Sequence, residues 1–274
     1  RLFALRVSSG ISIRNKSAFH IEASWMVSLR DESDVRAPKP QHTRDGKLVG
    51  EVQHADGERR ATMMLEWIPG RRSRHHVTTS HAYALGRVAA TLHKTTRGKE
   101  FWKTNDIIAW NVERICGDVI ENTLLTEMFP EITDLVDNIG AHVAEAIAGI
   151  SPNAIGLINA DLGMHNVLWH KSGPGLVDFN DSGIGPYAFC LARLRARLSH
   201  RENGADLSSA LMNGYRKVSK LPDGISECEG IFDLAADLFA ARYAAAKAAR
   251  GGNLTPLLAR QLFLGFLPRV ERLG

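Results

Sequence analysis

The sequence has few cysteines, and their spacing argues against a paired arrangement. Cys116, Cys190 and Cys228 are odd in number, lie far apart and form no C-x-x-C pair. A disulfide framework uses an even set of cysteines, and a thiolate zinc site uses closely spaced ones. We therefore expect reduced thiols in a cytoplasmic protein.

Long apolar runs are also absent. No segment reaches the roughly 18 consecutive apolar residues that suggest a membrane-spanning helix, and the first residues lack the pattern of a secretory signal peptide. We therefore expect no membrane partner. The chain also lacks a starting methionine and begins at Arg1, inside a predicted strand. We expect that an upstream segment is missing.

A basic stripe interleaved with aromatic residues is missing as well. The net charge is +4 and the pI is about 9.1, but the lysines and arginines are scattered along the chain. Nucleic-acid-binding proteins usually gather these residues on one face. We therefore expect no nucleic-acid partner, and an anionic cofactor accounts for the mild positive excess equally well.

Four histidines, at positions 75, 76, 81 and 93, raise the question of a zinc site. No carboxylate or thiol joins them at ligand spacing, and the sequence contains no H-E-x-x-H motif. Protein zinc sites use such combinations. The histidines therefore predict no zinc centre.

The overall composition is that of an ordinary soluble globular protein. Hydrophobic residues make up 44% of the 274 residues and charged residues 23%. A chain of this length suits one large domain or two smaller ones, with a sizeable core.

Two short strands are predicted in the second half of the chain. Val167–His170 and Leu176–Phe179 are mainly apolar, and the segment Lys171–Gly175 between them contains the glycines and proline typical of a turn. The pattern predicts a β-hairpin that is centred near Ser172.

Pairing outward from that centre sets Asn166 opposite Asp178. Directly opposed residues have Cα atoms about 4.5 to 5.5 Å apart. An amide oxygen and a carboxylate at that separation suit Mg²⁺, which prefers a few oxygen ligands and completes its shell with water and phosphate. Asp161 precedes Asn166 by five residues, in the loop that enters the hairpin. Its carboxylate can therefore stand beside the metal as a proton acceptor, the arrangement used in phosphoryl transfer.

These motifs resemble those of the phosphotransferase enzyme family, which includes aminoglycoside phosphotransferases, choline kinases and homoserine-kinase-like proteins. The family pattern is roughly H-x-D-x-x-x-x-N followed by [IV]-D-F-x-D. It is matched here from Asn159 to Asn166 and from Val177 to Asp181. The resemblance implies an α+β, protein-kinase-like fold with two lobes. A small, truncated antiparallel-sheet lobe with the hinge would span residues 1–70, and a larger, mainly helical lobe would span residues 71–274.

The remaining predicted elements fit that organisation. Strands are predicted from their β-forming residues and bounding turns, and helices from apolar residues at three- and four-residue steps. The predicted strands are Leu2–Val7, Lys47–His54 and Arg60–Ile68, and the predicted helices are His20–Leu29, Thr79–His93 and Glu131–Ile150.

The resemblance also implies a nucleotide site. Arg6 would reach the ATP phosphates, and Glu22 would pair with Arg6 and hold it there. Glu66, Trp67 and Ile68 would form the hinge that binds adenine through the backbone. Without the resemblance, Arg6 is equally typical of a surface arginine on an edge strand and Glu22 of an exposed helical glutamate. The segment Glu66–Ile68 is then typical of a plain strand end.

The function implied is ATP-dependent phosphorylation of a hydroxyl group, with ATP and Mg²⁺ as cofactors. Asp161 would accept the proton, and Asn166 and Asp178 would hold the metal. The acceptor would be a small molecule of the amino alcohol, amino acid, sugar or aminoglycoside class. A protein serine or threonine stays open as an alternative acceptor, and the chain would be a monomer or a homodimer.

Three departures from the family pattern bear on this hypothesis. Asn159 replaces the usual histidine, Cys190 replaces an aspartate, and no glycine-rich phosphate cover precedes the first strand. We expect both replacements to weaken the support of the Asp161 loop without changing its chemistry. They also motivate an alternative function, a nucleotide-binding scaffold without turnover.

Overall fold

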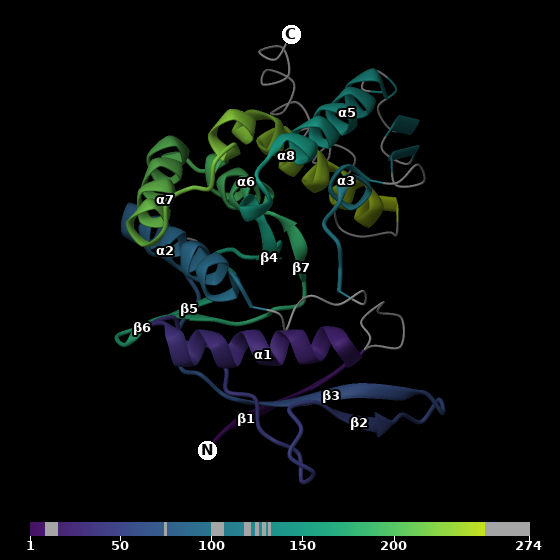
Figure 1. Ribbon diagram of the computed structural model, residues 1–274, viewed down its shortest axis with the longest axis vertical. Coiled ribbons are helices and arrows are strands. Elements are labelled where there is room, and N and C mark those ends of the chain that lie inside the picture. The colour runs from purple at the N-terminus through teal and green to yellow at the C-terminus, as the bar shows by residue number, and fades with distance from the viewer. Residues whose placement is uncertain are drawn as a thin grey trace. The chain divides into compact units, whose positions relative to one another are not determined.

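The structure is a computed structural model that describes residues 1–8, 16–73, 76–99, 107–117, 122–123, 126–127, 130 and 133–249 (Figure 1). The chain divides into two compact units, each built from segments far apart in the sequence. The first unit is Arg1–Ile108, Gly156–Ile184 and Arg201–Lys220; the second is Ala109–Ile155, Gly185–His200 and Leu221–Gly274. The lobe boundary expected at residue 70 is a different division and stays a prediction.

A three-stranded antiparallel sheet opens the first unit. Its strands are β1 (Phe3–Val7), β3 (Arg59–Glu66) and β2 (Gly50–Gln53), in the order β1-β3-β2. Phe3 pairs with Glu66 and Gly50 with Thr62. All three strands were predicted, and each is shorter than expected at one end or both.

Helix α1 (Lys16–Glu32) packs against β3 and lies along the sheet (Figure 1). It contains the predicted helix His20–Leu29, and the predicted apolar stripe is buried, with Ile21 2% exposed and Trp25 and Leu29 0% exposed. Glu22, which taken alone is typical of an exposed helical glutamate, is only 1% exposed. The helix is therefore buried over a wider face than its apolar stripe indicates.

Helices α2 (Thr79–Thr96) and α7 (Gly204–Val218) pack closely in the same unit (Figure 1). A Cβ atom added to Gly86 would lie 1.9 Å from the Leu211 carbonyl oxygen, and one added to Gly214 would lie 1.9 Å from that of Tyr83. Both glycines therefore permit backbone-to-backbone contact. The side chain of Thr78 caps α2 by accepting from the His81 N–H, as threonine commonly does at the start of a helix.

The second unit is mainly helical. Its helices are α3 (Val112–Cys116), α5 (Thr133–Gly149), α6 (Tyr187–Ser199), α8 (Ile225–Ala249) and the short 3₁₀ helix η2 (Pro152–Ala154). Helix α8 packs against α3, α5 and α6, and an aromatic cluster of Trp110, Phe189 and Phe239 supports these contacts. Helix α5 confirms the predicted helix Glu131–Ile150 over residues 133–149 and ends one residue early, and Glu131 and Ile132 lie outside the described residues.

Two further strand pairs complete the described elements. Strand β4 (Ile155–Asn159) pairs with β7 (Ser182–Pro186), and β5 (Val167–His170) pairs with β6 (Gly173–Leu176). The chain between β4 and β7 therefore carries the predicted catalytic residue Asp161 and the predicted metal ligands Asn166 and Asp178. Among the described helices, none combines the length and apolarity needed to cross a membrane.

Candidate active site

The β5–β6 hairpin has a different register from the predicted one. Val167 pairs with Leu176 and His170 with Gly173, so the chain reverses at residues 171 and 172. The prediction of a turn over Lys171–Gly175 and a strand over Leu176–Phe179 was wrong. Gly173 has a φ of 101°, which glycine adopts at little cost, and this allows the earlier reversal.

The new register places Asn166 opposite Val177. The Val177 N–H donates to the Asn166 carbonyl at 2.9 Å. The predicted pairing of Asn166 with Asp178 was therefore wrong by one residue, and in a strand a one-residue slip turns every side chain to the opposite face. The alternation of side chains between the two faces does not apply to Asp178, because this residue lies beyond the end of β6.

Asp178 has a left-handed backbone conformation. Its φ of 65° is the only positive φ of a non-glycine residue in the described chain, and aspartate tolerates this region better than most residues. Its Oδ1 accepts from the Asn180 N–H at 3.1 Å, and the residue is exposed. The strand therefore ends before Asp178, and the backbone turn directs this acidic residue to the surface of the loop.

The side chains of two asparagines hold Asp161 through its backbone and its carboxylate. Its N–H donates to Asn159 Oδ1 at 3.0 Å. The Nδ2 of Asn166 donates to the Asp161 carbonyl at 3.1 Å and to Asp161 Oδ2 at 2.9 Å. Because the nitrogen of the Asn166 amide serves Asp161, its oxygen is the atom that suits a cation. Asn166 is 4% exposed, so this geometry is fixed in the interior of the loop.

Asn159 joins the two motif loops. Its Nδ2 donates to the Asp178 carbonyl at 3.0 Å, while its Oδ1 receives the Asp161 N–H. The expected role of this position as a brace is confirmed. We expected Asn159 to support the Asp161 loop less well than the usual histidine. The hydrogen bonds show no such weakening, because the asparagine side chain is shorter than histidine but still reaches both loops. Cys190 is buried in α6 and forms no disulfide with a described residue, and its predicted effect stays a prediction.

His165 is a residue at this site that the sequence did not reveal to us. Its Nε2 lies 3.0 Å from Asp161 Oδ2. The signal available was a histidine directly before the motif asparagine. The pair spans four residues but lies in a loop, where helical periodicity gives no indication of contact.

Arg6 and Glu22 form the predicted ion pair. The guanidinium contacts both carboxylate oxygens, with Arg6 Nη1 bonded to Glu22 Oε2 and Nη2 at 3.5 Å from Oε1. The guanidinium carbon also lies 4.9 Å from the centre of the Phe19 ring. Arg6, a residue of β1, is thereby held against α1.

The predicted hinge begins where β3 ends. The Glu66 N–H donates to the Lys39 carbonyl at 2.9 Å, and the Trp67 N–H donates to the Leu2 carbonyl at 3.0 Å. Trp67 is 59% exposed and Ile68 is 8% exposed. The Ile68 N–H donates to no residue that the structure describes, which leaves it suited to a ligand acceptor.

The segment after the hinge is attached to the hairpin. Arg71 and Trp169 exchange two backbone hydrogen bonds, of 2.9 and 2.8 Å. The guanidinium of Arg36 donates to the Gly173 carbonyl at 3.1 Å and to that of Pro69. The hinge and the metal-motif hairpin of the first unit are thus linked directly.

The part of the chain that the structure describes contains no metal-binding cluster of histidine, cysteine, aspartate and glutamate side chains. No three His, Cys, Asp or Glu side chains there are grouped to hold an ion; His75 lies outside the described residues. A cation at the hairpin would instead use Asn166 and Asp178 with water and phosphate oxygens, the ligand set that Mg²⁺ prefers.

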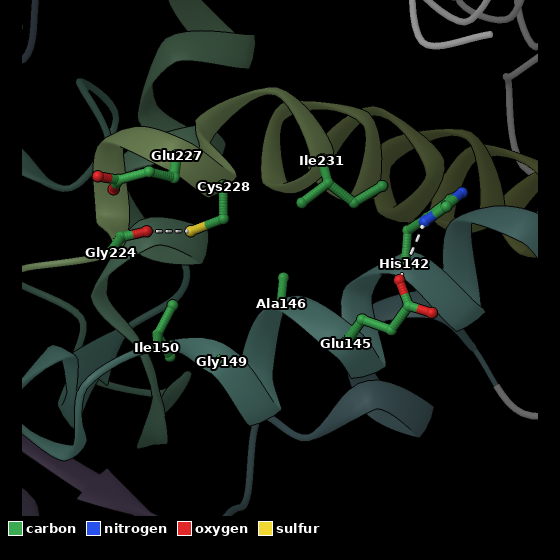
Figure 2. A pocket seen from close by; sticks show the side chains of 9 residues that line it. All are labelled: His142, Glu145, Ala146, Gly149, Ile150, Gly224, Glu227, Cys228 and Ile231. Carbon is green, nitrogen blue, oxygen red and sulfur yellow. Dashed lines mark hydrogen bonds and ion pairs between the residues drawn. The ribbon is translucent and has the colours of Figure 1, made fainter.

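A separate cavity of about 470 Å³ lies between α5 and α8 in the second unit (Figure 2). Ala146, Ile150 and Ile231 form much of its apolar lining, and Cys228 donates to the Gly224 carbonyl at its edge. None of the predicted site residues lines this cavity. It is therefore not the predicted nucleotide site.

A sequence model of the phosphotransferase enzyme family matches residues 3–228. The chain belongs to the phosphotransferase enzyme family. The resemblance drawn from the D-x-x-x-x-N and V-D-F-N-D motifs is thereby confirmed. No curated protein matches the chain.

Solved kinase structures share the fold. A microcompartment-associated aminopropanol kinase is 22% identical with a TM-score of 0.70, over 97% of this chain and 83% of its own. An amicoumacin kinase, hAmiN, solved with AMP-PNP, Ca²⁺ and Ami, is 18% identical with a TM-score of 0.76, over 98% and 82%. An aminoglycoside phosphotransferase from Alicyclobacillus acidocaldarius is 16% identical with a TM-score of 0.66, over 98% and 84%. The predicted α+β, kinase-like fold is therefore confirmed.

Proposed function

We propose that this phosphotransferase moves the γ-phosphoryl group of MgATP to a hydroxyl of a small molecule. The observation that supports this most directly is the asparagine framework around Asp161. Asn166 holds the Asp161 carboxylate, and Asn159 holds the backbone of both Asp161 and Asp178. A proton acceptor and two oxygen ligands for a cation are thereby kept in one connected unit.

The residues have distinct roles in this proposal. Asp161 orients the acceptor hydroxyl and takes its proton. The oxygen of Asn166 and the carboxylate of Asp178 would hold Mg²⁺, which supplies charge neutralisation on the phosphates. Phosphoryl transfer has a loose transition state, so positioning and charge account for most of the catalysis.

The nucleotide would be held by the first unit's sheet and hinge. Arg6, fixed by Glu22, would contact the non-transferred phosphates, since a guanidinium can bind phosphate through two parallel hydrogen bonds. The backbone of Glu66, Trp67 and Ile68 would receive adenine. The Ile68 N–H, which donates to no described residue, is the suitable donor.

The acceptor class is proposed more broadly. The solved relatives are named for aminopropanol, amicoumacin and an aminoglycoside, so we propose an amino alcohol, amino acid, sugar or aminoglycoside. The positive net charge of +4 disfavours a dedicated polycation site. We also propose a cytoplasmic monomer or homodimer without a nucleic-acid or membrane partner.

The main alternative is a nucleotide-binding scaffold without turnover. A scaffold needs no proton acceptor, yet Asp161 is held by hydrogen bonds from its backbone and to its carboxylate. That arrangement favours an enzyme. A protein serine or threonine as acceptor would use the same Asp161, Asn166 and Asp178 side chains. Only an activity assay distinguishes a protein acceptor from a small-molecule acceptor.

The test is ATP consumption with a panel of acceptors that includes aminopropanol, choline, homoserine and kanamycin. We expect Mg²⁺-dependent phosphorylation of at least one of them. Asp161→Ala and Asp178→Ala should each lower kcat by at least about a hundredfold. Asp137→Ala, at an exposed position of α5, is the matched control. Nucleotide binding without ATP consumption would favour the scaffold instead.

A further inference from the structure

His165 contacts the oxygen of Asp161 that Asn166 also binds. The distances to Asp161 Oδ2 are 3.0 Å from His165 Nε2 and 2.9 Å from Asn166 Nδ2. The two donors are consecutive residues of one loop, which is closed by a hydrogen bond of 3.0 Å from the Asn166 N–H to the Gly163 carbonyl. Their spacing on the carboxylate is therefore set by the backbone.

Two donors on one oxygen restrict the carboxylate more than one donor does. The contact from His165 reaches the oxygen from a different residue than the contact from Asn166, and it restrains rotation of the carboxylate about the Asn166 contact. Catalytic groups need their geometry held closely, because a misplacement of about 1 Å can cost about a hundredfold in rate. We propose that His165 is a positioning residue that fixes the carboxylate of Asp161, and this rests on the proton-accepting role proposed for Asp161.

The exposure of the pair distinguishes positioning from stabilisation. The side chain of His165 is 38% exposed and that of Asp161 is 30% exposed, and a polar contact between partly exposed side chains contributes little to folding stability. Removing His165 should therefore change catalysis and leave the unfolding midpoint almost unchanged.

Three substitutions separate the N–H donor from the rest of the ring. In His165→Gln, the amide nitrogen lies three bonds from Cβ, as Nε2 does in histidine. In His165→Asn, the nitrogen lies one bond closer, in the place of Nδ1, and should not reach Asp161. His165→Leu removes the donor and keeps a side chain of moderate size.

We expect kcat to fall about tenfold in His165→Leu and in His165→Asn, as for loss of one hydrogen bond to a charged group. His165→Gln should stay within about threefold of the wild type, and the KM for ATP should change less than about twofold in all three. Activity is measured with ATP, Mg²⁺ and the acceptor that the wild type phosphorylates best among aminopropanol, choline, homoserine and kanamycin. An unchanged kcat in His165→Leu, or equal losses in the Gln and Asn variants, would overturn the proposal.

Failure of the proposed function would be seen differently, because the wild type itself would then consume no ATP with any acceptor. A second measurement tests the contact without turnover. In protein labelled with ¹⁵N-histidine, we expect the His165 imidazole to carry its proton on Nε2, and this resonance should move in Asp161→Ala. A proton on Nδ1 alone, or a resonance unaffected by Asp161→Ala, would overturn the positioning role.

Discussion

The side-chain amide of Asn159 donates to the backbone carbonyl of Asp178 at 3.0 Å, and its oxygen accepts the backbone N–H of Asp161 at the same distance. One buried side chain thus fixes the loop of the proton acceptor to the loop of the metal motif. The two loops are separated by the whole β5–β6 hairpin in the sequence. A change in one loop is therefore transmitted to the other through Asn159, among other contacts.

Replacing Asn159 by leucine should damage both stability and activity. Asn159 is 1% exposed, so Asn159→Leu leaves two backbone groups without their partner, at a cost of about 1 to 3 kcal/mol each. We expect a lower free energy of unfolding in urea and a kcat reduced by at least about tenfold. Asn138→Leu, at an exposed position of α5, is the control. An unchanged kcat in Asn159→Leu would show that the bridge is dispensable.

The Arg6–Glu22 pair allows stability and catalysis to be separated. Glu22 is 1% exposed, and removing one partner of a buried ion pair costs about 3 to 5 kcal/mol because the other charge stays buried. We expect Arg6→Met to lower the free energy of unfolding by up to this amount and to raise the KM for ATP. The double variant Arg6→Met/Glu22→Gln should recover most of the stability.

The double variant should not recover the KM for ATP, because the guanidinium that we place at the phosphates is still missing. Denaturant unfolding and steady-state kinetics measure the two effects. Recovery of both would assign Arg6 a purely structural role.

The sequence predicted those features that a motif or a periodic pattern encodes. The Arg6–Glu22 pair followed from the family pattern. The stripe of Ile21, Trp25 and Leu29 followed from four-residue spacing, because a helix places these residues on one face. In each case the interaction is fixed by residue type and spacing.

The features that the sequence did not predict depend on tertiary contacts. Gly173, Pro174 and Gly175 have the composition of a turn, but they form β6 because the Arg36 N–H donates to the Pro174 carbonyl at 3.1 Å and the Leu176 N–H donates to the Arg36 carbonyl at 2.7 Å. A partner that lies 138 residues away in the sequence leaves no local signal. The burial of Glu22 and the contact of His165 with Asp161 are hidden in the same way.

The contact between α2 and α7 should tolerate no side chain at its glycines. A Cβ on Gly86 or Gly214 would meet a carbonyl oxygen at 1.9 Å, and backbone atoms cannot move aside as a flexible side chain can. We expect Gly86→Ala and Gly214→Ala each to lower the free energy of unfolding by more than about 2 kcal/mol. Gly140→Ala on α5 is the matched control, because nothing lies within 4 Å of the added Cβ.

The control should be stabilised by about 0.5 to 1 kcal/mol, since alanine loses less backbone entropy than glycine in a helix. Thermal and urea unfolding measure all three variants. A Gly86→Ala variant as stable as the wild type would contradict the close packing of the two helices.

Folding stability should depend on His93 at mildly acidic pH. His93 is 0% exposed, and its Nδ1 lies 3.0 Å from the Tyr215 hydroxyl. Burial, with a smaller effect from the charge of Arg97, lowers the pKa of His93 from 6.5 to about 3. The unfolded chain therefore binds a proton at this residue between about pH 6.5 and about pH 3, and the folded chain does not.

The stability that His93 contributes is thus present above pH 6.5 and is lost as the pH falls, by at most about 1.4 kcal/mol per pH unit. We expect the wild type to lose stability between about pH 7 and about pH 5 in urea titrations, and His93→Gln to show a shallower slope. Burial also lowers the pKa of His20, but that residue is partly exposed, so His20→Gln should change the slope less. Equal slopes in the wild type and His93→Gln would mean that the His93 ring takes up its proton without unfolding of the chain.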